Sequence, residues 1–256
     1  MRGPEVAAGA KLAFPLDDYD LERSAQLLAG FGQDRFGYVV TPNVDHVIRC
    51  YEDADFRNYY RNASYVLLDS RFLAHILRMT RGLKLPVCTG SDMTAQLFSK
   101  VMRPHDQVVL IGGREWQAQQ LIERFGLKSL RHFDPPMGFI RSPEQVEATL
   151  QFIEAHSPFR FCVIAVGTPQ GEMLAQMLKT RARCRGLTLC VGASIDFLTG
   201  VVPRAPLWMR RLGLEWLYRL ARSPKRLANR YLVKGPRVFA LLPKIAFELR
   251  PAGGDP

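Results

Sequence analysis

A carboxylate, a hydroxyl and an amide stand directly after two short apolar runs of the chain. Asp69 follows the run SYVLL at 64–68, and Thr41 and Asn43 follow FGYVV at 36–40. A carboxylate in such a place can take a proton from a sugar hydroxyl, and a neighbouring hydroxyl or amide can hydrogen-bond a sugar. Together with glycines at other run ends, these residue types suit a cleft able to hold a sugar and a phosphate group.

Glycines and further polar residues follow three other apolar runs. Glycine lets backbone N–H groups approach a phosphate oxygen closely, so these positions suit the phosphate part of a ligand. The candidates at these run ends are Gly112, Gly113, Gly167, Pro169, Gln170, Glu172 and Gly192. Because no GxGxxG pattern is present, a plain tight turn is the alternative for Gly112 and Gly113.

The order of apolar runs along the chain could bring these residues to one place. Apolar, β-branched runs alternate with segments of helical period, which is typical of a mostly parallel sheet covered by helices on both faces. The predicted strands are 36–40, 64–68, 107–111, 161–166 and 187–191, and the predicted helices are 20–31, 45–61, 71–80, 91–103, 114–125, 142–156 and 170–184. Ligands of open α/β sheets bind beyond the carboxyl ends of the strands. We therefore predict a Rossmann-like α/β fold with its site at that edge.

The basic charge of the chain is concentrated near its C-terminus. Ten Lys and Arg residues and a single acidic residue, Glu215, lie between Pro203 and Arg237, so this segment carries +9 of a formal net charge of +11. The strand pattern stops before it. We predict an α/β core at 13–202 and a basic helical appendage at 203–250. Such a segment is expected to meet an anionic partner.

The appendage combines its arginines with aromatic residues, including Trp208 and Trp216. Plotted as one helix, residues 206–221 place apolar side chains on one face, which is expected to pack on the core or to enter a bilayer. A solvated or protein-facing surface is the alternative for a basic tail.

Composition excludes several other classes of protein. A chain of 256 residues that is 47% hydrophobic and 23% charged is globular. The five cysteines form no CxxC pair, which indicates free thiols in a cytosolic protein, and the five histidines lack HxxxH or HExxH spacing. There is no apolar run long enough to span a membrane, and the first 20 residues lack the apolar core of an export signal. We expect a cytoplasmic protein without a metal centre.

Longer motifs carry a resemblance that spans about residues 20–245. In order, the chain reads TPNVDHV, LLDS, VCTGSD, VLIGG, PPMGF, AVGTPQGE, VGASIDFLTGVVPRAPLW and GLEWLYRLARSPKRLANRYL. The closing stretch, RAP-x-W followed by GLEW-x-YR, is the most specific because it fixes many residue types at fixed spacing. In these motifs the chain resembles the WecG/TagA/CpsF glycosyltransferase family, glycosyltransferase family 26.

The resemblance implies an inverting glycosyltransferase of bacterial cell-surface polysaccharide biosynthesis. Members of that family transfer a sugar, commonly N-acetylmannosamine or glucose, from a UDP donor to a polyprenyl-diphosphate-linked acceptor. They act at the cytoplasmic face of the membrane. The implied partners are thus a UDP-sugar, a lipid-linked glycan acceptor and an anionic membrane surface, with a homo-oligomer as a further possibility. The resemblance implies neither a metal nor any other cofactor.

The family's motifs place its functional residues on this chain. The proposed catalytic aspartate falls on Asp69, and the polar pair before it falls on Thr41 and Asn43. The T-G-T-D motif reads Thr89-Gly90-Ser91-Asp92 here. We take Thr89, Gly90, Asp92, Gly138 and the residues after the later strands as substrate-binding positions.

Two positions depart from the family's pattern. The G-x-P-K-Q-E motif appears at 167–172 with Gly171 in place of glutamine and Gln170 one place earlier. The catalytic aspartate is followed by Ser70 where glycine is usual. These departures leave the identity of the donor sugar open.

The leaving UDP concentrates negative charge, which arginine forks can neutralise. We expect this charge to be held by Arg204, Arg219, Arg226 and Arg230. Anionic lipid is expected to be bound by Arg210, Arg211, Lys225, Lys234 and Arg237. The triplet Asp18-Tyr19-Asp20 has the form of a metal-binding DxD, but it precedes the first predicted helix, so we interpret it as the start of that helix.

Simpler roles remain open for the central residues. Asp69 could cap the helix that begins near Arg71, and Asn43 could form only an Asx-turn after Pro42. Two other functions also remain open for the whole chain. One is an inactive scaffold of the same fold, and the other is a nucleic-acid-binding protein, although no nucleic-acid-reading motif is present and no such partner is expected.

Overall fold

Six parallel strands form the central sheet of the protein, which a computed structural model describes for residues 11–250. Their order across the sheet is β3 (Tyr65–Val66), β2 (Phe36–Val40), β7 (Gly186–Cys190), β6 (Phe161–Ile164), β4 (Val108–Ile111) and β5 (Leu130–Phe133). Every neighbouring pair in it is parallel. Each of the five predicted runs overlaps a strand, and the predicted α/β fold with a mostly parallel sheet is confirmed.

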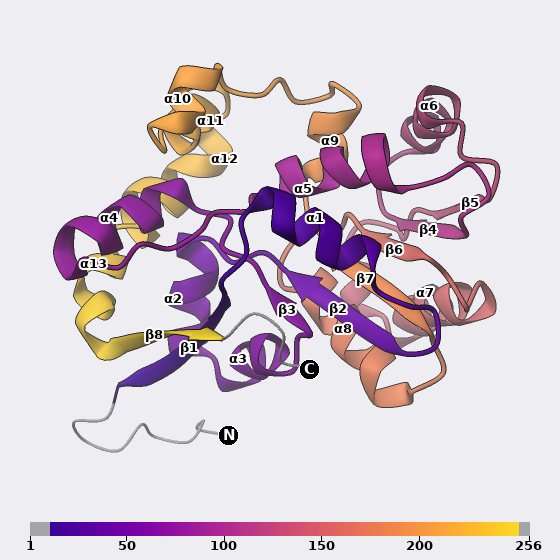
Figure 1. The fold of residues 1–256 in the computed structure, drawn as a ribbon, viewed down its shortest axis with the longest axis horizontal. Helices are drawn as coiled ribbons and strands as arrows, with labels where there is room; N and C mark the ends of the chain where they lie inside the picture. The colour runs from indigo at the N-terminus through magenta and orange to yellow at the C-terminus, as the bar shows by residue number, and fades with distance from the viewer. Residues whose placement is uncertain (1–10, 251–256) are drawn as a thin grey trace.

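Helices cover both faces of this sheet (Figure 1). Neighbouring strand residues point to opposite faces, so that Val40 and Ile111 enter one hydrophobic core while Val39 and Leu110 enter the other. The first core is closed by α2 (Val44–Glu52), α3 (Ala54–Arg61), α4 (Arg71–Arg81), α7 (Pro143–Ala155) and α8 (Gln170–Arg181). The second is closed by α1 (Leu21–Ala29), α5 (Gly90–Gln96), the π-helix η1 (Leu97–Val101), α6 (Glu115–Phe125) and α9 (Ser194–Leu198). Burial on both faces explains why the strands read as continuous apolar runs.

Two of the predicted helices are not single α-helices. The prediction of one helix over 45–61 is wrong, because Asp53 has extended backbone angles and caps α3 by accepting from the Asp55 and Phe56 amides at 2.9 and 3.1 Å. The helix predicted over 91–103 begins as α5 and widens into the π-helix η1. Periodicity shows neither event, because both keep the apolar side chains on the core side.

A second, two-stranded sheet joins the two ends of the described chain. β1 (Leu12–Asp17) pairs in parallel with β8 (Ile245–Arg250), so the prediction that no strand follows residue 200 is wrong. Asp17 accepts two hydrogen bonds from Arg250, both at 2.7 Å, and a third from the Val66 amide at 2.6 Å. The strand contains Pro15, which argues against a central strand, and its partner lies far along the sequence. Part of the prediction for the first 20 residues lies outside the described range.

The appendage is a chain of short helices. They are α10 (Leu207–Arg211), α11 (Glu215–Arg222), α12 (Pro224–Ala228), the π-helix η3 (Asn229–Lys234), α13 (Arg237–Leu241) and the 3₁₀-helix η4 (Leu242–Lys244). The single helix predicted over 206–221 is wrong, because the chain turns at Gly213. That residue has φ of 73°, and a Cβ on it would lie 3.0 Å from the Phe72 amide nitrogen. Between residues 11 and 250 we find no helix with the length and apolar character needed to cross a bilayer.

The appendage packs against the core at several points. The ring of Trp216 meets that of Phe72 edge-on, with 5.9 Å between centroids. Val238 is fully buried in the first hydrophobic core, and Arg237 forms an ion pair with Glu52 at 2.5 Å. In Figure 1 the helices α10 to α12 lie above α4, and a long linker connects α9 to α10.

Candidate active site

A cavity of about 800 Å³ lies where the residues after β2, β3, β6 and β7 face the appendage. Its wall combines polar residues of the core with cations from the appendage. The predicted site residues that line it are Thr41, Asn43, Asp69, Thr89, Gly90, Gly167, Glu172, Gly192, Arg219, Arg226 and Arg230. A volume of this size suits a small-molecule ligand, since ligand pockets commonly measure about 300–1,000 Å³. The topology thus brings four of the five predicted strand ends to one cavity.

Asp69 is held in place by the backbone on both sides. Its amide donates to Pro42 O at 2.9 Å, and its Oδ1 accepts from the Gly90 amide at 2.8 Å. It does not cap α4, because Ser70 does so by accepting from the Leu73 amide at 3.1 Å. The carboxylate of Asp69 therefore does not cap α4. It lines the cavity, and its second oxygen makes no contact that caps the helix.

The surroundings of Asp69 bring its ionisation close to neutral pH. Burial raises the pKa of Asp69 to about 7, and the carboxylates of Glu215 and Asp92 add to the rise. The hydrogen bond from Gly90 and the charge of Arg219 oppose it. A carboxylate with such a pKa is ionised in part at neutral pH and still basic enough to accept a proton from an alcohol.

A chain of hydrogen bonds runs along another wall of the cavity. The backbone amide of Asn43 donates to His46 Nδ1 at 3.4 Å, and His46 Nε2 lies 3.0 Å from Thr168 Oγ1. Thr168 in turn donates to Glu172 Oε1 at 3.0 Å. Burial, followed by the charge of Arg230, lowers the pKa of His46 to about 4, so that this ring is neutral.

Glu172 ends this chain with one oxygen unused. The residue is 4% exposed, and Tyr60 also donates to its Oε1 at 3.3 Å. Its Oε2 is buried and has no hydrogen-bond partner within residues 11–250. Burial raises the pKa of Glu172. An unpaired buried carboxylate oxygen is costly, and a donor group of a ligand in the cavity would satisfy it.

Arginines of the appendage close the cavity. Arg230 donates to Asn43 Oδ1 at 3.3 Å and lies 3.7 Å from Asp45. Arg219 stacks over the ring of Phe197 with 5.4 Å to its centroid. Arg226 lines the same space, and no hydrogen bond or ion pair of its side chain occurs in the described part of the chain. These guanidinium groups provide the forked donors that phosphate oxygens fit.

The sequence profile of the Glycosyl transferase WecG/TagA/CpsF family matches residues 11–251. The chain belongs to this family. The resemblance found in its motifs is therefore confirmed, and it extends over nearly the whole chain. WecG/TagA/CpsF proteins are glycosyltransferases of cell-surface polysaccharide biosynthesis, so membership implies glycosyltransferase activity, with a sugar donor and an acceptor.

Several residues predicted for the WecG/TagA/CpsF site lie outside the cavity wall. They are Asp92, Gly112, Gly113, Gly138, Pro169, Gln170 and Arg204. Gly112 and Gly113 have φ of 84° and 78° and form the tight turn after β4, which is the simpler of their two interpretations. Gly138 has open space around it before the 3₁₀-helix η2 (Phe139–Arg141).

The altered motif at 167–172 has a clear geometry. The Gln170 amide, oriented with its NH₂ group toward acceptors, donates to Gly167 O at 2.6 Å and therefore folds back on its own turn. Gly171 lines the cavity at the position where the family pattern has glutamine. A Cβ there would meet Ile164 at 3.4 Å, an ordinary contact. This chain thus lacks the amide side chain of the family pattern at this position of the cavity wall.

The structure adds residues that the sequence did not identify. His46, Arg49, Arg71 and Arg210 all line the cavity. The histidine spacing gives His46 no role as a metal ligand, but its place three residues after the capping residue Asn43 is a usable signal. Arg210, expected to favour lipid, faces inward and contacts Asp92 at 3.4 Å.

The described residues contain no cluster of three or more His, Cys, Asp or Glu side chains suited to a metal ion. Asp20, in the triplet of DxD form, caps α1 by accepting from the Arg23 amide at 2.9 Å. Its interpretation as a helix start is confirmed.

Proposed function

We propose that this protein transfers a sugar from a UDP-sugar to a polyprenyl-diphosphate-linked acceptor, with inversion at the anomeric carbon. The observation that carries the proposal is the position of Asp69, a carboxylate with a raised pKa in a cavity that appendage arginines close. The donor would be of the N-acetylmannosamine or glucose type. The reaction would serve bacterial cell-surface polysaccharide biosynthesis.

Asp69 acts as the base in this proposal. Its carboxylate takes the proton of the acceptor hydroxyl while that oxygen bonds to the anomeric carbon and the bond from that carbon to the UDP oxygen breaks. Because attack and departure occur on opposite faces of the sugar, the configuration inverts. Thr41 and Asn43 lie beside this point and would position hydroxyl groups of the two sugars.

The departing diphosphate would be held by Arg219, Arg226 and Arg230. All three line the cavity, and Arg226 has no competing partner among the described residues. Arg230 rests on Asn43 and Asp45 at 3.3 and 3.7 Å, contacts long enough for a phosphate to replace. We propose that these guanidinium groups take the place of a divalent metal, which implies that chelators leave turnover unchanged.

Glu172 supports recognition of the donor. Its unpaired Oε2 is fixed by Tyr60 and Thr168 through the other oxygen, so it is an acceptor of set direction. We propose that it binds a hydroxyl or N–H group of the UDP-sugar.

The outer side of the appendage would lie on the inner face of the cell membrane. Its exposed large apolar side chains outside the cavity wall are Leu207, Trp208, Leu212, Leu217 and Val233. Exposed cations, including Arg211 and Lys225, stand among them in the sequence. Aromatic and basic residues together favour an anionic interface, where a lipid-linked acceptor would also be found.

Release of UDP from a panel of UDP-sugars, with a polyprenyl-diphosphate-linked acceptor, tests the proposal. One UDP-sugar should support turnover, and Asp69→Asn should reduce kcat by about 100-fold to 10,000-fold while still binding UDP. Asp18→Asn is the matched control, since Asp18 is exposed and distant in sequence from every residue of the cavity. Turnover by Asp69→Asn at the wild-type rate would refute the role of the base. Activity lost with a chelator and restored by a divalent metal would refute the role of the arginines.

A further inference from the structure

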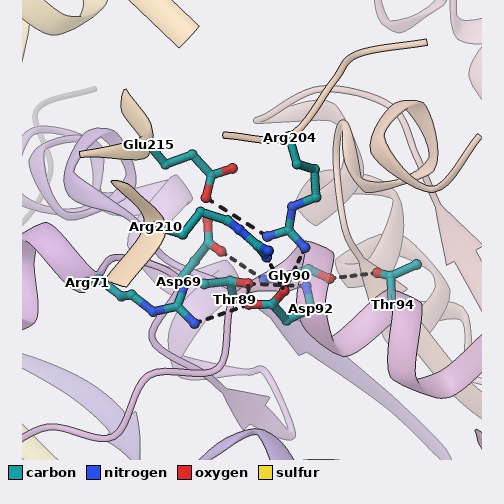
Figure 2. A network of polar contacts seen from close by, with 9 residues as sticks. All are labelled: Asp69, Arg71, Thr89, Gly90, Asp92, Thr94, Arg204, Arg210 and Glu215. Atoms are coloured by element: carbon teal, nitrogen blue, oxygen red, sulfur yellow. Dashed lines mark hydrogen bonds and ion pairs between the residues drawn. The ribbon is translucent and has the colours of Figure 1, made fainter. Parts of the chain in front are cut away.

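Asp92 is the centre of a polar network that joins the appendage to the core (Figure 2). Arg204, from the linker before α10, donates to Asp92 Oδ1 at 2.6 Å, and Arg210 of α10 reaches the same oxygen at 3.4 Å. Arg71 of α4 donates to Oδ2 at 3.2 Å, and the Thr89 hydroxyl donates there at 2.8 Å. One carboxylate therefore connects three separate segments of the chain.

These four donors use the full capacity of the carboxylate. A carboxylate has about four lone-pair sites, and each oxygen of Asp92 already accepts from two groups. The side chain is 15% exposed, and Asp92 is absent from the cavity wall. Although burial opposes ionisation, hydrogen bonds from Arg204, Thr89 and Arg71 outweigh it and lower the pKa of Asp92. The ionised form of the group is thus favoured, and it has no free site for substrate.

The turn that carries Asp92 also holds the proposed base. Thr89 caps α5 by accepting from the Asp92 amide at 3.1 Å, and the next residue, Gly90, donates to Asp69 Oδ1 at 2.8 Å. A Cβ on Gly90 would lie 2.9 Å from Thr41 Oγ1, so the turn fits tightly against that neighbour. Any shift of the turn would therefore disturb the hydrogen bond to Asp69.

Arg204 forms a shorter ion pair, 2.6 Å to Asp92, than the ion pairs described for the arginines of the cavity wall. It also lies 3.9 Å from Glu215 and 5.9 Å from the ring centroid of Phe197. Its contacts are with the core and with α11, and it does not line the main cavity. Its geometry fits a tether for the linker better than a ligand of the diphosphate.

We infer that Asp92 is a positioning residue, which clamps the segment 203–211 to the core and, through the turn 89–92, couples that contact to the placement of Asp69. The inference rests on the proposed function only where it takes Asp69 as the base. The residues of the cavity bind the substrate and carry out the chemistry. The clamp fixes the position of the appendage and the position of Asp69 at the same time. Arg204 is the main tether on the appendage side.

Hydrogen exchange of the full-length protein, followed by mass spectrometry, tests the coupling without turnover. Asp92→Asn keeps the shape of the side chain and removes its charge, and Arg204→Gln leaves Asp92 intact. In both variants, peptides covering 203–211 and 89–96 should exchange at least about tenfold faster than in the wild type. Glu147→Gln, which breaks the surface pair with Arg181, is the matched control and should leave both peptides unchanged.

If Asp92→Asn does not fold, Arg204→Gln alone tests the coupling between segment 203–211 and the turn 89–92. Faster exchange at 203–211 with unchanged exchange at 89–96 in Arg204→Gln would overturn the coupling. So would wild-type exchange in both peptides of both variants. Because neither readout needs a substrate, a protein without transferase activity could fail the proposed function and still show the clamp.

Steady-state kinetics of the same variants test the coupling in a second way. Each variant should lower kcat at saturating UDP-sugar by about tenfold, and the double variant should be within about twofold of Asp92→Asn alone, because both substitutions break one contact. Multiplication of the two single effects in the double variant would overturn the inference. A change confined to KM in Asp92→Asn would do the same, since it would indicate direct contact with substrate.

Discussion

Replacing Asp69 with asparagine should change the stability of the protein in a way that depends on pH. The pKa of this carboxyl is about 7 in the folded protein, against an ordinary value of 3.8. Folding thus raises it, and unfolding releases a proton between about pH 4 and pH 7, so rising pH favours the unfolded state in that window. The full difference corresponds to about 4 kcal/mol, since one pH unit is worth about 1.4 kcal/mol.

Asparagine cannot ionise, so Asp69→Asn does not show the loss of stability that ionisation of Asp69 causes in the wild type as pH rises. Relative to the wild type, the free energy of unfolding of Asp69→Asn should increase by about 3 kcal/mol between pH 5 and pH 8, which is the part of the titration that falls between those values. Other ionisable groups cancel in this comparison because both proteins contain them. The introduced asparagine can still accept from Gly90 through its amide oxygen, which keeps the turn in place.

Urea unfolding of both proteins at pH 5 and pH 8 measures the difference, and the same pKa should govern activity. Wild-type kcat/KM should rise about tenfold per pH unit below about pH 7 and then level off. Glu215→Gln should move this limb to lower pH, because Glu215 raises the pKa of Asp69, while Glu147→Gln should leave it in place. Equal pH dependence of stability in wild type and Asp69→Asn would refute the raised pKa.

Three further perturbations follow from named contacts. Glu172→Gln should raise the KM for the UDP-sugar about tenfold with a smaller change in kcat, as steady-state kinetics would show, and an unchanged KM would exclude Glu172 from donor binding. Asp17→Asn should lower the free energy of unfolding by about 2 kcal/mol in urea titrations, because it breaks the paired hydrogen bonds with Arg250; stability equal to that of Asp18→Asn would contradict this. Trp208→Ala should reduce flotation with anionic vesicles about tenfold, and Trp116→Ala, at an exposed tryptophan of α6, should not; equal losses would remove the membrane surface from the appendage.

The sequence predicts the central sheet well for a physical reason. Its strands are buried on both faces, so runs such as those of β4 and β6 contain only apolar residues and stand out from the helices between them. Since parallel strands end at one edge, the residues after them can be assigned to one site from the sequence alone.

The missed elements lack that signal. β1 contains Pro15 and, within residues 11–250, pairs only with β8, more than 200 residues away in sequence, so no local pattern marks either strand. β5, at the edge of the sheet, carries Arg131 and His132 in a run of four residues. The break at Gly213 depends on close approach to Phe72, which is a property of the tertiary structure.

The candidate site, like the fold, is predicted from the sequence only in part. Motifs identify Asp69 and the arginines as residue types, but the partner of each charge depends on packing between distant segments. Arg204 and Arg210 are near one another in sequence and are predicted to have different roles, yet both meet Asp92. His46, in the cavity wall, contacts Thr168, which lies 122 residues later in the sequence.

A crystal structure of the protein with UDP bound tests the central claim most directly. We predict that the diphosphate lies within hydrogen-bonding distance of Arg226 and Arg230, with its terminal phosphate directed to the part of the cavity that Asp69 lines. A nucleotide bound far from Asp69, or a diphosphate held by a metal ion with these arginines turned away, would contradict the account.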